Sequence, residues 1–172
     1  MEHDIAKIYE EYSKMIYNYL YCLCFDNTLS EDLTQETFYY ATKGIDKFRN
    51  DCKIQVWLCE IAKNLWFKEL KRRKRTVIVS IESEFGEIGE TKEIASEENV
   101  EDKFIEKEEK IELYKNLKKL TNIERQLIHL RLTSGLNFKD ISQIYKKSES
   151  WARVIYYRGK EKLREMYEKE EQ

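Results

Sequence analysis

Lysine and arginine side chains, gathered in two blocks, are the groups of this sequence best placed to do chemistry. Residues 60–75 and 146–164 each hold seven basic and two acidic residues, a local charge of +5. Between them, residues 82–112 hold thirteen acids and four lysines, a charge of −9. Clustered positive charge attracts polyanions such as nucleic acids. The pattern therefore predicts two contacts with a polyanion, separated by a hydrophilic tether.

Catalytic and metal chemistry have little support in the sequence. The carboxylates are spread along polar stretches with no histidine or cysteine arranged beside them, so we expect no enzyme. His3 and His129 are far apart, and the cysteines lack zinc-site spacing. We therefore expect no metal and no cofactor, and reduced thiols at four positions: Cys22, Cys24, Cys52 and Cys59.

The composition is that of a soluble, helical protein. There is no proline and there are five glycines, so little interrupts a helix. No run approaches the roughly 18 apolar residues of a membrane span. Residues 1–4 have neither the basic start nor the apolar run of a signal peptide. We expect a cytoplasmic protein with no direct membrane insertion.

The first part of the chain has the periodicity of helices. Apolar side chains recur at three- and four-residue steps over residues 5–23, which predicts one amphipathic helix. Thr28 and Ser30 are candidate N-caps of a second helix. A third helix follows the polar stretch 49–53 and ends in the first basic block. We expect these helices to form one domain, residues 1–75.

The predicted fold class is all-α, with two small helical domains joined by a flexible acidic linker. Residues 76–108 form that linker, because a short β-like run, Val77–Val79, is followed there by a glutamate-rich stretch containing glycines. The second domain, residues 109–172, resumes the helical period.

The second domain has the layout of a helix-turn-helix. Thr121–Glu124 is a capping box, and the helix that it begins is predicted to end at Gly135. Asn137 caps a short helix, and Ser148 caps a long basic one. The turn between them has Lys146 where glycine is common. Long helix, short helix, tight turn and long helix is the order of this DNA-binding motif.

The final helix has one apolar face and one polar face. The residues expected to pack inward are Ala152, Ile155, Tyr156, Gly159, Leu163 and Met166. The opposite face shows Ser150, Arg153, Val154, Tyr157 and Arg158. Arginine, serine and tyrosine near a helix N-terminus can contact base edges or phosphates in a major groove.

Several segments together resemble the sigma-70 family of RNA polymerase sigma factors, specifically its extracytoplasmic-function (ECF) group. Residues 30–38, SEDLTQETF, resemble the family's E-D-L-x-Q-E-x-F helix, and residues 57–64, WLCEIAKN, resemble its W-L-x-x-I-A-x-N helix. Residues 117–120, 124–131 and 158–163 resemble its C-terminal domain. The resemblance covers nearly the whole chain outside the linker. It implies a non-enzymatic subunit that brings polymerase to promoter DNA and opens it.

The resemblance implies that the E-D-L-x-Q-E-x-F helix docks on the clamp helices of the polymerase's largest subunit. The implied polymerase-binding residues are Asp32, Leu33, Gln35, Glu36 and Phe38. Polar groups around apolar anchors suit such a docking surface. From the residues alone, an alternative is that Leu33 and Phe38 are core and that the acids cap the helix.

By the same resemblance, the next helix and the loop before it recognise the −10 element and capture bases that leave the stack. The implied residues are Asn50, Asp51, Cys52, Lys53, Lys63, Asn64, Lys68, Lys71, Arg72 and Arg73. Trp57 is expected to pack in the core, and Trp66 to lie nearer the exposed face. Lys68 stands where many members have aspartate, so no −10 sequence preference is carried over.

The resemblance assigns −35 recognition to the final helix and its turn. The implied residues are Lys147, Ser148, Glu149, Ser150, Trp151, Arg153, Val154, Tyr157 and Arg158. Residues 149–153 differ from the commoner V-G-T-V-K pattern, so the role is carried over without a target sequence.

The implied partners are core RNA polymerase, promoter DNA and an anti-sigma factor, which in this group is often membrane-anchored. Two alternatives from other classes stay open at this point. One is a stand-alone helix-turn-helix regulator, which gives no reason for the E-D-L-x-Q-E-x-F helix. The other is a helical adaptor whose basic tracts are merely solvated, for which neither half would bind DNA.

Overall fold

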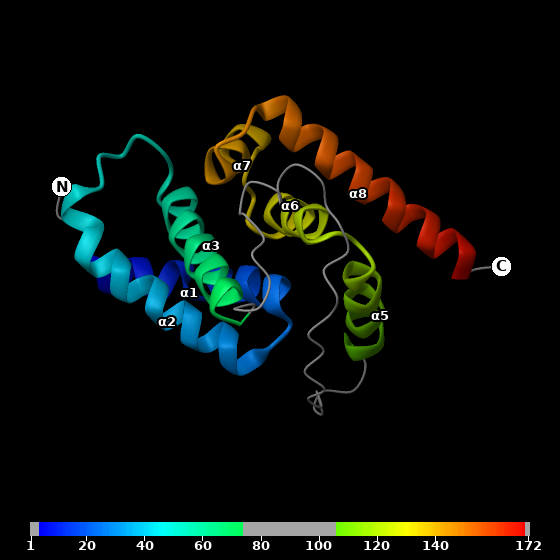
Figure 1. Cartoon of the computed structure of the whole chain (residues 1–172), viewed down its shortest axis with the longest axis horizontal. Helices are drawn as coiled ribbons and strands as arrows, with labels where there is room; N and C mark the ends of the chain where they lie inside the picture. Colours follow the sequence, from blue (N-terminus) through cyan, green and yellow to red (C-terminus); the bar gives the residue numbers. More distant parts are fainter. Residues whose placement is uncertain (1–3, 74–105, 171–172) are drawn as a thin grey trace.

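The computed structural model describes residues 4–73 and 106–170, and their secondary structure is helical, as predicted. The N-terminal elements are α1 (Ile5–Cys24), α2 (Asn27–Gly44), a 3₁₀ turn (Ile45–Lys47) and α3 (Ile54–Arg73). The C-terminal elements are α5 (Glu106–Lys118), α6 (Asn122–Thr133), α7 (Phe138–Tyr145) and α8 (Glu149–Glu170) (Figure 1). Helix α5 begins inside the segment predicted as linker. The rest of that segment, with Val77–Val79, lies outside the described residues.

The start of α2 differs from the prediction. Asp26 is its N-cap, because the carboxylate accepts a hydrogen bond from the backbone N–H of Leu29 (2.9 Å). The predicted caps Thr28 and Ser30 are therefore wrong. Ser30 lies within the first turn, is buried, and donates its hydroxyl hydrogen to the Asp26 carbonyl (2.6 Å). The aspartate has the extended backbone conformation that an N-cap requires.

The predicted caps of the C-terminal domain are confirmed. Thr121 and Glu124 form the capping box of α6, and Ser148 accepts from the Trp151 N–H (3.1 Å) at the start of α8. Asn137 forms a second capping box with Asp140, which the sequence analysis had not identified. These reciprocal hydrogen bonds fix where each helix begins.

Two residues of the C-terminal domain adopt left-handed backbone conformations. Gly135 has a φ of +66°, just beyond the last turn of α6. Lys146 has a φ of 53° and ends α7. A side chain at this φ is uncommon but tolerated in a single residue. The helix-turn-helix therefore makes its tight turn without the usual glycine.

The N-terminal core forms where the apolar faces of α1, α2 and α3 meet. Ile16, Tyr19 and Leu20 of α1 have no exposed surface. Trp57 was predicted to pack in the core; it packs against Phe48, with ring centroids 5.0 Å apart, but is only half-buried, at the edge of the core. The prediction for Trp66 is wrong: it is 8% exposed, because its position on α3 turns it into the same core.

Helix α8 crosses α6 at Gly159, which allows a close approach. A Cβ at that position would lie 2.8 Å from Ile128 Cδ1 and 3.0 Å from Glu124 Cβ. The buried Glu124 carboxylate also accepts from Lys162 Nζ (2.8 Å). The predicted inward face of α8 is confirmed, since Ala152, Ile155 and Tyr156 are buried. Only glycine lets the backbone approach this closely.

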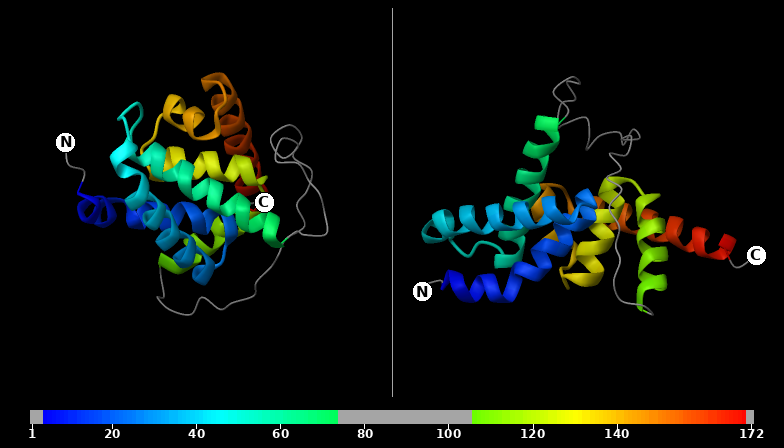
Figure 2. Two further views of the ribbon diagram at one scale, coloured as in Figure 1. Left: turned by 60° about the vertical axis from the view of Figure 1, so that its left-hand side comes forward. Right: turned by 90° about the horizontal axis from the view of Figure 1, so that it is seen from below.

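The two domains pack directly against each other. Helix α6 contacts α1, and α7 contacts α3, so that the apolar residues of both domains form one continuous cluster. Figure 2 shows α8 extending from this body towards the C-terminus. The contact places the helix-turn-helix beside the helix predicted to recognise the −10 element.

Candidate nucleic-acid interface

The N-terminal half of α8 presents the predicted −35 face. Ser150, Arg153 and Arg158 are exposed, and Val154 and Tyr157 are 54% and 56% exposed. The other face of the helix is buried against α6 and α7. A helix held in this way can present its outer side chains to a major groove.

Arg153 is oriented by its own domain. Its guanidinium donates to Glu149 Oε1 (2.5 Å) and lies 4.8 Å from the ring centroid of Phe138. The Phe138 ring also packs against Tyr157. An arginine that is stacked and ion-paired loses less conformational freedom on binding than an unrestrained one.

The other predicted −35 residues are divided between the surface and the turn. Lys147, Ser148 and Glu149 are exposed, and the Lys147 N–H donates to the Ser142 carbonyl (3.0 Å) across the turn. Trp151 is half-buried, and its ring contacts that of Tyr145 (5.6 Å between centroids). Trp151 therefore packs mainly inward, away from the predicted −35 face.

The loop predicted to capture a −10 base is mostly exposed. Asn50, Asp51 and Lys53 are exposed, and Cys52 is half-buried. Asn50 has a φ of 58°, which sharpens the turn before α3. Lys53 is already engaged, because its Nζ lies 2.7 Å from Asp140 Oδ2 at the start of α7.

The predicted −10 residues on α3 differ in accessibility. Asn64, Lys68 and the three basic residues at the end of the helix are exposed. Lys63 is 6% exposed and donates from Nζ to the Ile144 carbonyl of α7. Burial lowers the pKa of Lys63 to about 8, while Glu60 opposes that shift. Within this arrangement Lys63 is covered by the other domain.

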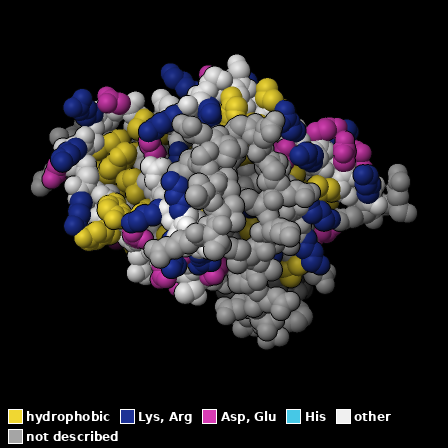
Figure 3. All heavy atoms as spheres, viewed as in Figure 1, with side chains coloured by type: hydrophobic (Ala, Val, Ile, Leu, Met, Phe, Trp, Pro, Cys, Tyr) yellow, Lys and Arg dark blue, Asp and Glu magenta, His cyan; other side chains and the backbone are white. Residues whose placement is uncertain are grey.

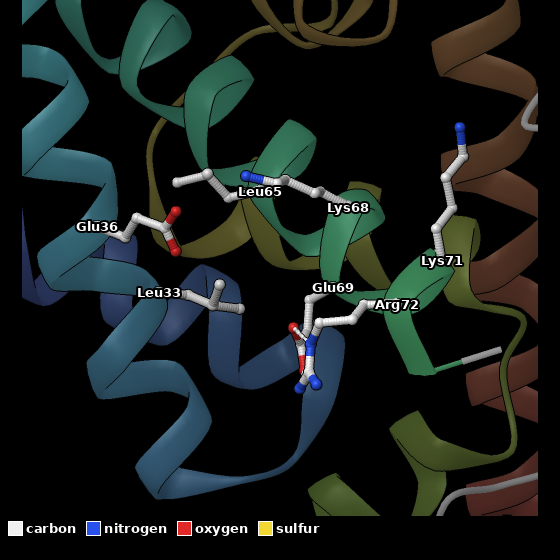
Figure 4. A pocket seen from close by; sticks show the side chains of 7 residues that line it. All are labelled: Leu33, Glu36, Leu65, Lys68, Glu69, Lys71 and Arg72. Carbon is white, nitrogen blue, oxygen red and sulfur yellow. Dashed lines mark hydrogen bonds and ion pairs between the residues drawn. The ribbon is translucent and has the colours of Figure 1, made fainter. Parts of the chain in front are cut away.

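A hollow on the surface lies between α2 and α3. It is lined by Leu33, Glu36, Leu65, Lys68, Glu69, Lys71 and Arg72 (Figure 4). In that view Glu69 and Arg72 lie together, and Arg72 donates two hydrogen bonds to the Glu69 carboxylate (2.6 and 2.8 Å). These bonds, with one from Arg73, lower the pKa of Glu69 to about 2. The hollow joins the predicted docking helix to the basic end of α3.

The predicted polymerase-docking residues separate into two groups. Asp32 and Gln35 are exposed and Glu36 is half-buried. Leu33 and Phe38 are 4% and 5% exposed, so their side chains are core, as the alternative interpretation had it. The accessible part of this face is therefore polar and acidic.

Exposed aromatic side chains lie beside this acidic face. Tyr39 and Tyr40 of α2 are 54% and 41% exposed, and Lys43 Nζ lies 4.4 Å from the Tyr39 ring centroid. Figure 3 shows hydrophobic side chains at the left of the view, over α2, with lysines and arginines around them. Exposed aromatic residues are enriched at protein interfaces relative to the rest of a protein surface.

The sequence analysis missed the residues that join the two domains. Arg125 of α6 is 5% exposed, and its Nε donates to the Cys22 carbonyl (2.8 Å). The Tyr19 and Tyr145 hydroxyls are 3.0 Å apart and buried. Half of residues 123–130 are polar or charged, so the sequence gave no clear signal that Arg125 would be buried.

Metal-binding and membrane-spanning features are absent from the part of the chain that the structure describes. Within residues 4–73 and 106–170, no three acidic, histidine or cysteine side chains are grouped to hold a metal ion. No helix in these ranges has the length and apolar character to cross a membrane. Burial raises the pKa of the Cys22 and Cys59 thiols to about 12.

Comparison with known families identifies both halves of the chain. The model of Sigma-70 region 2 matches residues 8–76, and that of Sigma-70, region 4 matches residues 117–165. Among curated proteins, the ECF RNA polymerase sigma factor SigM of Bacillus subtilis is 26% identical, over 95% of this chain and 94% of its own length. The ECF sigma factor SigX of the same organism is 25% identical, over 98% and 86%.

Solved structures share the fold. The sigma factor RpoE, in complex with the anti-sigma factor NepR from Bartonella quintana, matches with a TM-score of 0.72 and 19% identity, over 97% of this chain and 98% of that one. CnrH, in complex with the cytosolic domain of CnrY, matches with a TM-score of 0.66 and 17% identity, over 95% and 87%. At these identities the likeness concerns the fold alone.

Proposed function

The chain belongs to the sigma-70 family and is an ECF sigma factor, and from this premise we propose how its surfaces divide the work of initiation. A sigma factor recruits core RNA polymerase to specific promoters, recognises their −10 and −35 elements, and helps to melt the DNA. We propose that α2 docks on polymerase, that α3 and its preceding loop bind the −10 element, and that α8 binds the −35 element.

One observation carries the proposal: two basic helices, each in its own sigma region, occur in one chain beside an acidic, tyrosine-bordered face on α2. Basic side chains supply the phosphate contacts that position a protein on DNA. Acidic side chains cannot bind DNA phosphates, so α2 is left for a protein partner. Asp32, Gln35 and Glu36 supply its accessible polar groups.

The energy for melting comes from binding, because the protein has no fuel of its own. Bases that leave the stack would be held by the loop at Asn50–Lys53, while Asn64, Lys68 and Lys71 contact the strand's backbone. Trp66 does not take part, since it is core. The factor would therefore act as a DNA-binding initiation subunit without an enzymatic step.

We further propose an anti-sigma factor as the negative regulator. One structure that shares this fold holds a sigma factor bound to an anti-sigma factor, and another holds CnrH bound to the cytosolic domain of CnrY. The hollow between α2 and α3 offers such a partner apolar walls and both signs of charge. A membrane anchor, if the partner has one, would lie in the partner.

Run-off transcription tests the sigma role. Bacterial core polymerase with this protein should initiate from a defined subset of promoter fragments. Asp32→Ala with Glu36→Ala should reduce initiation at least tenfold, because the docking carboxylates are lost. The matched control is Glu10→Ala with Asp46→Ala, which removes two exposed acids elsewhere in the same domain and should leave initiation unchanged.

The same assay separates the sigma factor from a stand-alone regulator. A regulator would bind promoter fragments without polymerase and would support no initiation from any of them. Equal loss of initiation in both double variants would show that net charge, and not the α2 face, is what matters.

A further inference from the structure

The exposed face of α8 has an apolar centre. Val154 and Tyr157 lie one turn apart on this helix and are 54% and 56% exposed. Ser150 lies one turn before Val154 on the same side of the helix. Arg153 and Arg158, which are also exposed, lie at the two edges of this side. Phosphate contacts need only the arginines, so the apolar centre needs a separate explanation.

The stability of the free helix does not explain Val154. Valine is a weaker helix former than alanine or arginine, because its branched Cβ loses freedom against the preceding turn. More than half of the residue is exposed, so little burial offsets that cost. Neither helix propensity nor packing therefore accounts for a valine at this position in the unbound protein.

Both apolar side chains have defined positions. Valine in a helix adopts essentially one χ1 rotamer. The Tyr157 ring packs against the rings of Phe138 and Tyr156, with centroids 6.1 and 5.2 Å apart. Helix side chains lean towards the N-terminus, and the small Ser150 in that direction leaves the Val154 methyls accessible. The centre of the face is thus rigid and open, so that binding costs little conformational entropy.

Charge around the apolar centre favours a polyanion as its partner. Arg153 lies against the Phe138 ring (4.8 Å) on one side, and Arg158 is exposed on the other. One turn after Tyr157, the same side of α8 ends in Glu161, which pairs with Arg164. A carboxylate at that position is repelled by DNA phosphates. The DNA-contacting part of α8 is therefore residues 150–158.

Thymine carries the group that fits an apolar centre. In the major groove the base edges display hydrogen-bond donors and acceptors, and the C5-methyl of thymine is the apolar group that side chains contact there. Valine has no donor or acceptor in its side chain. Opposite a guanine or cytosine edge, Val154 would displace water from polar atoms without replacing their hydrogen bonds, which is unfavourable.

We infer that Val154, with the Tyr157 ring beside it, packs on the C5-methyl group of a thymine in the −35 element and thereby selects that base. The inference rests on the proposed −35 role of α8 and adds the chemistry of one base to it. Either strand can carry the thymine, since both present their edges in the major groove. Arg153 and Arg158 contact guanine edges or phosphates on the two sides of it.

Removal of one methyl group sets the expected size of the effect. Uracil lacks the C5-methyl of thymine and keeps all of its hydrogen-bonding groups. Burial of a methyl-sized apolar group corresponds to about a fourfold preference. Uracil at the contacted position should therefore lower initiation by the wild-type protein about fourfold. Val154→Ala removes the methyls that make the contact, so thymine and uracil should then be equivalent.

Run-off transcription with core polymerase and the full-length protein measures this preference. A promoter fragment from which the wild-type protein initiates is prepared with each −35 thymine, on either strand, replaced in turn by uracil. The fragment is left unsaturated, so that initiation follows affinity. Val154→Ala keeps the fold, because the position is exposed and alanine is the better helix former.

The matched control variant is Leu132→Ala. It removes an apolar side chain that is 68% exposed on α6, in the same domain but away from the face of α8. It should keep the fourfold response to uracil. Uracil at a thymine of the spacer between the two promoter elements is the control on the DNA, and it should change initiation by none of the proteins.

Two outcomes would overturn the inference. One is a response to uracil that is the same in the wild-type protein and in Val154→Ala, because the methyl would then contact another residue. The other is the absence of a response at every −35 thymine. If Val154→Ala lowers initiation in that second case, its side chain contacts a protein instead of a base.

Failure of the sigma role would look different. The wild-type protein would then initiate from no fragment, with thymine or with uracil, and the inference would fall with that role. Where the wild-type protein initiates, the comparison of Val154→Ala with Leu132→Ala decides on the methyl contact alone.

Discussion

The two basic surfaces of this sigma factor carry the same local charge in the sequence but differ in accessibility. The predicted −35 face of α8 is exposed, and Glu149 and Phe138 of the same domain orient its Arg153 side chain. The side of α3 predicted to bind the −10 element is partly covered by the other domain, at Lys53 and Lys63. Charge content in the sequence thus predicts a DNA-binding helix, whereas packing between the domains determines how much of that helix is accessible.

The largest effect on the predicted −35 face is expected when α8 is displaced from α6. Gly159→Val would place a side chain 2.8 Å from Ile128 Cδ1 and 3.0 Å from Glu124 Cβ. Overpacking at such a site should lower the free energy of unfolding of the C-terminal domain by about 3 kcal/mol. Urea denaturation of the full chain, together with −35 duplex binding, measures the effect.

Lys160→Val is the matched control for that substitution. It adds the same β-branched side chain one residue later on α8, at an exposed position. It should change stability by much less, because nothing buried is displaced. Equal destabilisation by the two variants would show that helix propensity, and not the close approach at Gly159, sets the cost.

A smaller effect is expected when the −35 face alone is changed. Arg153→Ala should weaken binding to a −35 duplex about tenfold, since an arginine contact to a base pair contributes about 1–3 kcal/mol of discrimination. Fluorescence anisotropy with a labelled duplex gives the affinity.

Arg164→Ala provides the control on the same helix. Arg164 is also exposed and ion-paired, with Glu161 and Glu168, but lies far from the N-terminal part of α8. Comparable losses of affinity from both variants would mean that α8 binds DNA by net charge and has no specific reading face.

The sequence predicted the helices of the C-terminal domain and the exposed face of α8, but not which side of α3 faces the core. Helical period and the capping box at Thr121 predicted α6 and α8, because both signals are local. The exposed face of α8 followed from the same period. Trp66 was placed wrongly, because which side of α3 faces the core depends on how α1 and α2 pack against it. The apolar periodicity of one helix does not show how its neighbours pack against it.

The domain contact was the least predictable part. Tyr19 and Tyr145 are 126 residues apart in the sequence, and each alone resembles an ordinary core tyrosine. Lys63 resembles a surface lysine of a basic block, although it is buried. No local pattern indicates that a lysine will donate to a carbonyl of another domain. Pairings of this kind follow only from the assembled structure.

The smallest expected effect is a dependence of the contact between the two domains on pH. Burial lowers the pKa of Lys63 to about 8 when the domains are in contact, below its usual value of 10.5 in water. The groups facing its ammonium are Glu60 on its own helix, Lys146 at the end of α7, and the Tyr145 ring, whose centroid is 5.3 Å away. Because the lowered pKa belongs to a base, forming the domain contact releases a proton between pH 8 and 10.5. The contact is therefore favoured as pH rises through that window, and the gain is lost as pH falls to 8.

Small-angle X-ray scattering of the full chain at pH 7.5 and 9.5 measures this dependence. The protein should be more compact at the higher pH. The ratio of molecules with separated domains to molecules with domains in contact should change by at most about tenfold per pH unit, since one proton is involved. Lys63→Met should give a flat profile, because it keeps the aliphatic stem and has no proton to release. A wild-type protein that expands between pH 7.5 and 9.5 would contradict the sign of the effect. In that event, repulsion among other deprotonating groups would dominate over Lys63, and the contact between α3 and α7 would not depend on the charge of this lysine.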